Sequence, residues 1–314
     1  MDAQTSPFGP SADDLLVLLA VARTGRFTTA ARRLGINHTT VARRIAALEA
    51  ALGGRVMRRG DAGWTLTPLG ERAAGAAEAV EAALGGVAAA DPRSELSGLI
   101  RLSATDGFSG FIAAPAMAAL RRRHPAVSLE VVAVTRQASQ QRIGADLEVV
   151  VGRPEVRRAE AVQLGEYALG LYASPGLLAE RGRPRDPEDL AGAPLIYFIE
   201  SMLQVDVLDD ARHLLPEMVD AVTSTNVYVH VEATRAGAGF GLLPAFLADR
   251  HPDLVRVLPD RIERRLPYWL VARAEALRQP VVTAYVRALR ERIAQVEGAL
   301  LGRRAAATDS PGTG

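Results

Sequence analysis

The sequence contains no cysteine among its 314 residues. A chain without thiols has no disulfide, no thiolate zinc site, no iron–sulfur cluster and no cysteine nucleophile. Lysine is absent as well, because all 37 basic side chains are arginines. This excludes a lysine Schiff base and the phosphate-binding lysine of P-loop proteins. Arginine therefore remains the only strong cation for phosphate, guanine or an anionic ligand.

Long apolar runs are also missing, since none approaches the roughly 18 residues that a membrane span needs. Residues 1–10 lack the basic and apolar regions of a signal peptide. The chain is 48% hydrophobic, and its length favours about two domains. We therefore expect a globular, cytoplasmic protein.

The formal net charge of +1 hides an uneven distribution. Residues 15–72 hold ten arginines and three acids, a charge of +7, whereas residues 1–14 and 73–314 each carry −3. A basic segment on a slightly acidic body is typical of a nucleic-acid-binding domain. Charge alone fits an unevenly charged, solvated surface equally well.

Three helices are predicted in the basic segment, each preceded by a capping side chain and ended by a glycine. The expected caps are Ser11 with Asp14, then Thr28, then Asn37, and the expected ends are Gly25, Gly35 and Gly53. The second and third helices, joined by a short turn with a glycine, form a helix-turn-helix.

The third helix has one apolar stripe for the core and one face suited to DNA. Small residues flank Arg43 on that face, so the helix can approach a groove floor while the guanidinium reaches guanine or phosphate. A purely structural helical hairpin needs no such polar tip. The residues expected to bind DNA are Thr28, Thr29, Asn37, His38, Thr39, Thr40, Arg43, Arg44, Arg58 and Arg59.

A hairpin and a long helix follow. Residues 55–59 and 64–67 are predicted strands joined by a turn, which makes a wing. Thr67 and Pro68 fit the N-cap and N1 positions of an Ala-rich helix that reaches about Ala89. Its apolar positions suit pairing with a second protomer, and the alternative is packing on its own chain.

Beyond a boundary at residues 91–94, strands alternate with helices. This order predicts α/β structure with largely parallel sheets, arranged in two lobes because a fresh strand and helix begin near Leu169. The expected strands are 99–103, 127–134, 147–151, 168–173, 195–199, 255–258 and 269–271, and the first expected helix is 109–123.

Ligands of such sheets bind at the carboxyl ends of strands, so the residues that follow the strands are candidates. The expected ligand-binding residues are Thr105, Asp106, Gln137, Ser139, Thr225 and Asn226. Each side chain alone is better explained as a helix cap. The glycines of residues 237–241 follow a predicted helix and are interpreted as a helix stop and turn, not as a dinucleotide motif.

Catalytic and metal-binding patterns are absent from the sequence. The five histidines are scattered, and no HExxH or Gly-x-Ser-x-Gly motif occurs. Asp209 and Asp210 are adjacent, which on a helix does not make a facing pair, and we interpret them as solvated surface. We expect no enzyme activity, no metal and no cofactor.

The sequence resembles the LysR-type transcriptional regulators over roughly residues 12–300. The matching residues of the first part are 26–45, Leu48-Glu49, Leu52-Gly53, Arg59 and 66–70. Those of the body are 142–147, Ser174-Pro175, 189–192, 236–239 and Leu243-Pro244. The resemblance implies a winged helix-turn-helix, a linker helix and a two-lobed, periplasmic-binding-protein-like effector domain.

The resemblance also implies function. It implies a dimer or tetramer on an interrupted inverted repeat of double-stranded DNA, and a small effector between the lobes, often a carboxylate or an aromatic metabolite. Thr105 matches the hydroxyl residue that the family has after the first strand. Three residues depart from the pattern: Ala42 cannot make the contacts usual at its position, and Asp61 and Trp64 stand in a wing that is often basic.

The predicted domains are a DNA-binding domain (1–67), a linker and dimerisation helix (68–92), an effector domain (93–302) and a disordered tail (303–314). Three hypotheses follow: a ligand-responsive transcription factor, a ligand-independent architectural DNA-binding protein whose body only oligomerises, and an enzyme with a DNA-binding domain. The missing catalytic patterns disfavour the third.

Overall fold

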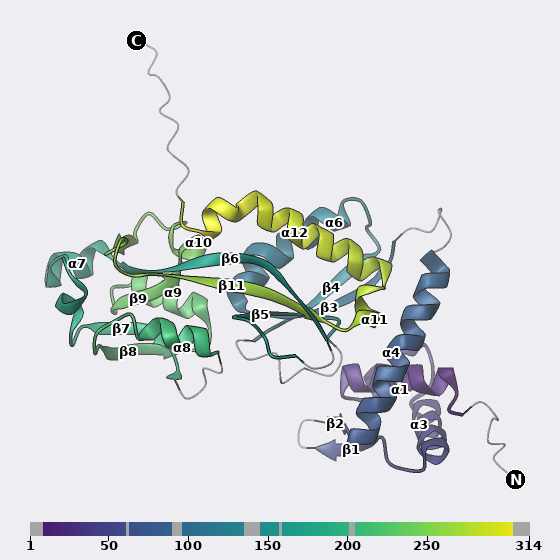
Figure 1. Ribbon diagram of the computed structural model, residues 1–314. Helices are drawn as coiled ribbons and strands as arrows, with labels where there is room; N and C mark the ends of the chain where they lie inside the picture. The colour runs from purple at the N-terminus through teal and green to yellow at the C-terminus, as the bar shows by residue number, and fades with distance from the viewer. Residues whose placement is uncertain are drawn as a thin grey trace, which may run out of the picture. The chain divides into compact units, whose positions relative to one another are not determined.

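The computed structural model describes residues 9–60, 63–89, 96–134, 145–156, 159–200 and 205–303. It forms two compact units (Figure 1). The first unit comprises Met1–Leu96 with Gln141–Asp146 and Arg273–Thr283, and the second comprises the rest. The predicted boundary at 91–94 and most of the predicted tail lie outside the described residues.

The first unit holds the predicted helix-turn-helix and hairpin. Its elements are α1 (Ala12–Thr24), α2 (Phe27–Leu34), α3 (His38–Leu52), β1 (Met57–Gly60), β2 (Gly63–Leu66), α4 (Pro68–Ala89) and α11 (Ala274–Leu277). The three predicted glycine stops are confirmed, because Gly25, Gly35 and Gly53 all adopt left-handed backbone at the ends of α1, α2 and α3. β1 and β2 pair as an antiparallel hairpin.

The predicted N-caps are only partly right. Asn37 caps α3 as expected, since its side chain accepts a hydrogen bond from the Thr39 amide at 2.9 Å. Ser11 occupies the N-cap position of α1 but makes no side-chain cap bond, and the carboxylate of Asp14, the other half of the predicted capping box, pairs with Arg44. The prediction for Thr28 is wrong: Thr28 lies inside α2, whose N-cap position belongs to Arg26.

The core of the first unit joins α1, α3, the hairpin and the first half of α4. Ala73 and Ala77 of α4 are buried in this core, so that half of the helix packs on its own chain. Further along α4, Leu84 is 56% exposed. The apolar positions of α4 were predicted to contact a second protomer. Those in the first half of the helix instead pack on the same chain, and Leu84 further along faces solvent.

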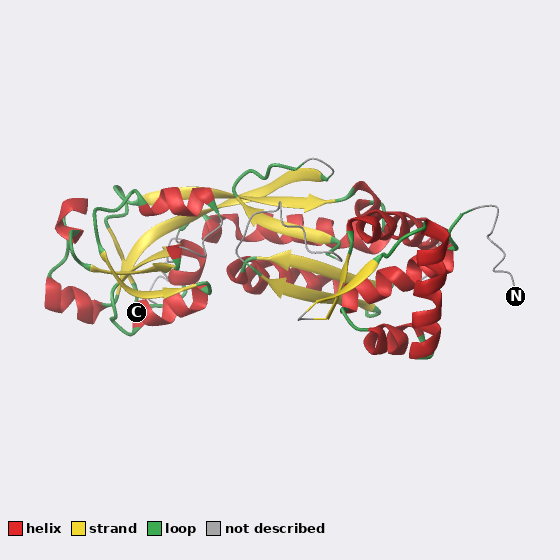
Figure 2. Ribbon diagram, turned by 90° about the horizontal axis from the view of Figure 1, so that it is seen from below, coloured by secondary structure: helices red, strands yellow, loops and turns green. Residues whose placement is uncertain are grey.

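In its described residues, the second unit contains nine strands and the helices that cover them (Figure 2). Its strands are β3 (Gly98–Ala104), β4 (Val127–Ala133), β5 (Leu147–Val151), β6 (Glu160–Ala173), β7 (Pro194–Phe198), β8 (Val219–Ser224), β9 (Phe240–Pro244), β10 (Val255–Val257) and β11 (Glu263–Ala272). Its helices are α5 (Asp106–Phe108), η1 (Ser109–Ala113), α6 (Ala114–Arg121), α7 (Pro175–Arg181), η3 (Pro187–Leu190), α8 (Asp206–Arg212), α9 (Val227–Arg235), α10 (Ala245–Ala248) and most of α12 (Pro280–Leu300).

The sheet follows the order β4-β3-β5-β11-β6-β9-β7-β8, with β10 on β6. Both ends of the order are parallel, as predicted, because β3 pairs in parallel with β4 and β5, and β7 pairs in parallel with β8 and β9. The middle is antiparallel: β11 pairs with β5 and β6, and β6 with β9. The expected two lobes are therefore two parallel groups joined by the long crossing strands β6 and β11.

The crossing strands are longer than the sequence indicated. The predictions covered 168–173 and 269–271, whereas β6 begins at Glu160 and β11 at Glu263. The register between them shifts between Tyr268 and Trp269, where a β-bulge bends the pair. The helix predicted from 109 starts earlier, at α5, and is interrupted by the π-helical turn η1, a feature that often marks functional sites.

Gly70 provides a test of how tightly the first unit packs. A Cβ atom at this position of α4 would collide with the carbonyl oxygen of Val56 beside β1. We expect Gly70→Ala to lower the free energy of unfolding of the first unit by about 1–3 kcal/mol, because backbone cannot move aside as a flexible side chain can. The measurement is urea unfolding in a Trp269→Phe background, where the fluorescence of Trp64 reports on this unit alone.

Gly75→Ala is the matched control on the same helix. A Cβ atom there meets nothing nearer than 4.0 Å, so the change should stabilise α4 by about 1 kcal/mol through helix propensity. An unchanged urea midpoint for Gly70→Ala would show that α4 is not seated on the hairpin as described.

Candidate functional site

The tip of α3 presents polar side chains to solvent. Asn37, His38 and Thr39 are exposed, and the Asn37 side chain also accepts a hydrogen bond from the Thr39 hydroxyl at 2.9 Å. Arg43 lies one turn further along and is exposed. On the buried side of the same helix, Val41 is fully enclosed in the core. The separation of faces that the sequence predicted is thus present.

Not every arginine of the first unit is available for a partner. Arg44 donates to Asp14 at 3.1 Å and lies 3.4 Å from Asp13, so it reaches phosphate only by giving up these ion pairs. Arg23 forms a two-pronged pair with Glu81 of α4 at 2.6 and 2.7 Å. Six arginines between residues 15 and 72 have a side chain that makes no hydrogen bond or ion pair, to backbone or side chain, among the described residues. They are Arg26, Arg32, Arg33, Arg43, Arg58 and Arg59.

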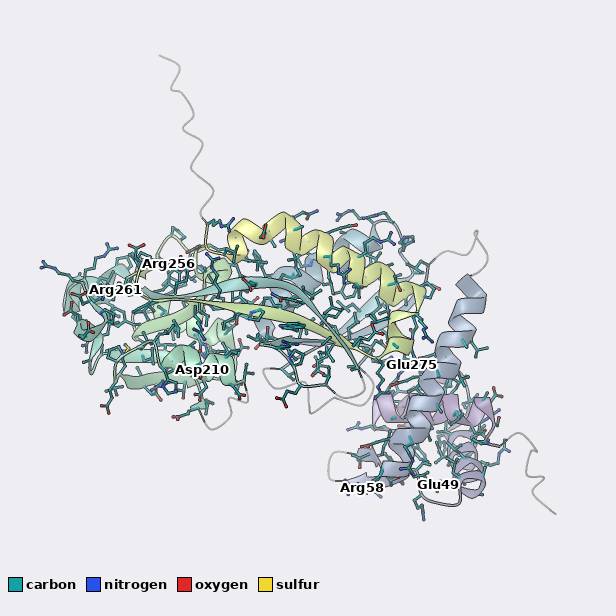
Figure 3. All side chains as sticks on the ribbon, viewed as in Figure 1. Glu49, Arg58, Asp210, Arg256, Arg261 and Glu275 are labelled. Carbon is teal, nitrogen blue, oxygen red and sulfur yellow. The ribbon has the colours of Figure 1, made fainter. Side chains whose placement is uncertain are left out.

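The hairpin carries exposed arginines and is fixed to the helix-turn-helix. Arg58 and Arg59 lie on β1 and are exposed, with Arg58 at the edge of the unit in Figure 3. The Trp64 amide donates to the carbonyl of Gly25 at 3.0 Å. The Trp64 ring stacks on Phe27 of α2 with centroids 4.8 Å apart. Trp64, which departs from the usual basic wing, therefore serves as a packing residue.

The second unit contains a cavity at the carboxyl end of β3, with an empty volume of about 400 Å³ that includes its open mouth. Its lining comes from both lobes and from the crossing strands. The lining residues are Thr105, Asp106, Gly107, Val151, Tyr167, Leu169, Phe198, Leu208, Val227, Pro244, Phe246 and Tyr268. Four of these twelve are aromatic, against 5% of the whole chain, so the wall is strongly enriched in rings.

Two of the six predicted ligand-binding residues line this cavity. Thr105 and Asp106 do so, and Thr105 makes no side-chain cap bond to α5, so the helix-cap alternative is wrong for it. For Asn226 the cap alternative is right, because its side chain accepts from the Tyr228 amide at 2.8 Å and caps α9. Neither Thr225 nor Asn226 lines the cavity. Gln137 and Ser139 lie outside the described residues.

Among the described residues that line the cavity, Asp106 is the one carboxylate. Burial raises the pKa of Asp106 above its usual range, and within the described part of the chain Asp106 has no hydrogen bond or ion pair. Burial also raises the pKa of Tyr268, although a hydrogen bond with the Thr105 side chain partly offsets this. The neighbouring Tyr228 has a raised pKa, first through burial and also through the negative charge of Asp106.

Aromatic side chains line the cavity on two sides. Tyr167 of β6 stacks on Tyr268 of β11 with centroids 4.6 Å apart, and its edge faces Phe246 at 5.8 Å. Phe198, at the end of β7, lines the other side. Sequence reasoning missed these rings because each occupies an apolar position that looks like ordinary core. The available signal was position: Phe198 ends a strand, and Phe246 lies two residues after the end of another.

The remaining expectations concern an acidic pair on the surface, a metal site and a membrane-spanning helix. Asp209 and Asp210 are exposed on α8, as predicted, and Asp210 is labelled in Figure 3. Across the described residues, no group of three or more acidic or histidine side chains is arranged to hold a metal ion. In the same part of the chain, no helix combines the length and apolarity needed to cross a membrane.

Two family profiles match the chain. The profile described as "Bacterial regulatory helix-turn-helix protein, lysR family" matches residues 12–71, and the "LysR substrate binding domain" matches residues 93–294. The first match covers the helix-turn-helix and hairpin. The second covers the strands and the cavity.

Curated relatives are similar at moderate identity. The transcriptional regulator DmlR of Escherichia coli is 30% identical over 193 residues, which cover 61% of this chain and 63% of DmlR. The transcriptional regulator PtxR of Pseudomonas aeruginosa is 27% identical over 299 residues, which cover 89% of this chain and 92% of PtxR.

A solved structure agrees in fold. A full-length OxyR variant from Pseudomonas aeruginosa superposes with a TM-score of 0.71 at 17% identity, covering 89% of this chain and 94% of OxyR. At this identity the likeness supports the fold alone. The two profile matches, which together include both compact units, show the family, and the chain belongs to the LysR family of transcriptional regulators.

Proposed function

We propose that this LysR-type regulator changes its action on DNA when a small molecule occupies the cavity of its second unit. The observation that carries the proposal is the aromatic cavity at the carboxyl end of β3, which holds a carboxylate and a hydroxyl that no helix cap uses. Convergent polar groups in an apolar cavity are what small-molecule sites provide. The description of the matched domain as substrate binding supports the same conclusion.

The DNA contacts of the proposal come from two places on the first unit. The tip of α3, from Asn37 to Arg43, reads base edges in a major groove, because small exposed residues there allow close approach. Thr28 and Thr29, at the start of α2, and Arg58 and Arg59, on the wing, contact backbone phosphates and fix the position of the protein. Arg44 takes part only if its ion pairs with Asp13 and Asp14 open.

The proposed function also requires that the protein assembles into dimers and tetramers. Two protomers pair through the exposed part of α4, where Leu84 faces solvent, and pairs associate into a tetramer. A two-fold assembly presents two helix-turn-helix units to an interrupted inverted repeat. The protein acts in the cytoplasm as a regulator without a catalytic role. Its proposed domains are the DNA-binding domain 1–67, the linker helix 68–92 and the effector domain 93–302.

Arg43 tests the DNA surface. We expect Arg43→Ala to weaken specific DNA binding by about 5- to 150-fold, because one good contact to a base is worth about 1–3 kcal/mol. The probe is a duplex selected from a random pool by the unaltered protein, and the measurement is the Kd by fluorescence anisotropy. Arg290→Ala, which removes the same charge from an exposed position of α12, should leave the Kd unchanged. Equal Kd values for the two variants would remove Arg43 from the DNA contacts.

Thr105 tests the ligand response. We expect Thr105→Val to raise the ligand concentration for half-maximal change in DNA affinity by about 2- to 10-fold, the value of one hydrogen bond. DNA affinity without ligand should stay the same. The ligands are those members of a metabolite library that raise the Tm of the unaltered protein, and Thr105→Ser, which keeps the hydroxyl, is the control.

An unaltered dose response in Thr105→Val would exclude Thr105 from the ligand site. If no library member raises the Tm or alters the DNA affinity, while binding tolerates any sequence and depends steeply on salt, the proposal fails. That result would favour the ligand-independent architectural protein.

A further inference from the structure

Resting on the function proposed above, we propose that the cavity binds a small organic cation, an ammonium group carried on an apolar or aromatic body, with Asp106 as its counter-ion and the aromatic wall as its cage. The sequence resemblance implied a carboxylate or an aromatic metabolite. The charge of the residues that line the cavity favours a cationic ligand over a carboxylate.

Asp106 supplies the negative charge. Its carboxylate lines the cavity and has no hydrogen bond or ion pair with any described residue. Desolvation of an unpaired carboxylate is unfavourable, as its raised pKa reflects. A ligand that brings a positive charge to within hydrogen-bond distance removes this penalty, whereas a ligand carboxylate would add a second negative charge beside the first.

The aromatic wall favours the same class. Tyr167, Tyr268 and Phe246 form one connected cluster, and Phe198 lines the cavity from the second lobe. Ring faces attract cations, most strongly where water is excluded, and such cages are the usual sites for alkylammonium groups. Leu169, on β6 beside these rings, provides an apolar contact for the uncharged part of the ligand.

The cations around the cavity do not provide a site for an anion. No arginine or histidine is among the residues that line it within the described chain. His230 stacks edge-on against Phe198 at 4.7 Å, but burial lowers its pKa, and its Nε2–H donates to the Ser224 carbonyl at 2.9 Å, so it is neutral at neutral pH. The exposed Arg250 guanidinium lies over the ring of Phe111, 5.8 Å from its centroid, and its charge acts on the hydroxyl of Tyr228, but it does not line the cavity.

Three ligands with one ring and different charges test the proposal. Benzylamine is protonated at neutral pH, benzyl alcohol is neutral and benzoate is an anion. We expect titration calorimetry on the full chain to give the order benzylamine, benzyl alcohol, benzoate, with benzylamine binding about tenfold tighter than the alcohol, which corresponds to about 1.4 kcal/mol.

Variants then assign the preference to its residue. Asp106→Asn keeps the shape of the side chain and removes its charge, so the preference for benzylamine should disappear while the affinity for benzyl alcohol stays the same. Retained binding of the alcohol also shows that the variant cavity is folded. Asp210→Asn removes the same charge from the exposed surface of α8 and should change neither affinity.

Benzoate binding as tightly as benzylamine would overturn the proposal, and so would an unchanged preference in Asp106→Asn. The order in the unaltered protein requires no variant, so a folding failure of Asp106→Asn leaves the test decisive. Absence of binding by all three ligands also overturns the cation class. That outcome is distinct from failure of the proposed function, which the metabolite library tests independently through DNA affinity.

Discussion

The pairing of β6 with β11 is the interaction on which the second unit depends. The two strands run antiparallel over ten residue pairs, from Glu263 opposite Gly170 to Ala272 opposite Glu160. Each also pairs with other strands, β11 with β5 and β6 with β9 and β10. Both groups of parallel strands are therefore joined to the same antiparallel pair, β6 and β11. The same pair of strands contributes Tyr167, Leu169 and Tyr268 to the cavity, so the strands that hold the lobes together also line the cavity.

The first unit was largely predictable from sequence because its determinants are local. A helix end fixed by a left-handed glycine, as at Gly25 and Gly53, needs only neighbouring residues to form. The same holds for Asn37, which bonds two residues ahead. The errors arose where a distant partner competed for a local group, as when Arg44 took the carboxylate of Asp14.

The second unit was less predictable because its strands pair across long stretches of sequence. The first halves of β6 and β11 mix polar and apolar residues, and each becomes a strand only by pairing with the second half of the other. The aromatic rings of the cavity were missed for a related reason. Tyr167 and Tyr268 are as buried as residues of the hydrophobic core, and only the fold shows which buried residues line a cavity. Thr105 and Asp106 could be predicted because a strand end is a recognisable position.

The stacking of Trp64 on Phe27 has a mechanical consequence. This contact and the amide bond to Gly25 fasten the wing to α2, so the wing arginines and the tip of α3 form one rigid template with a fixed spacing. A rigid template cannot adapt to a duplex whose groove width differs from that spacing. In the DNA complex proposed above, the elastic work of matching the two surfaces would fall on the DNA, and sequences that bend or narrow easily would be preferred even at base pairs that no side chain touches.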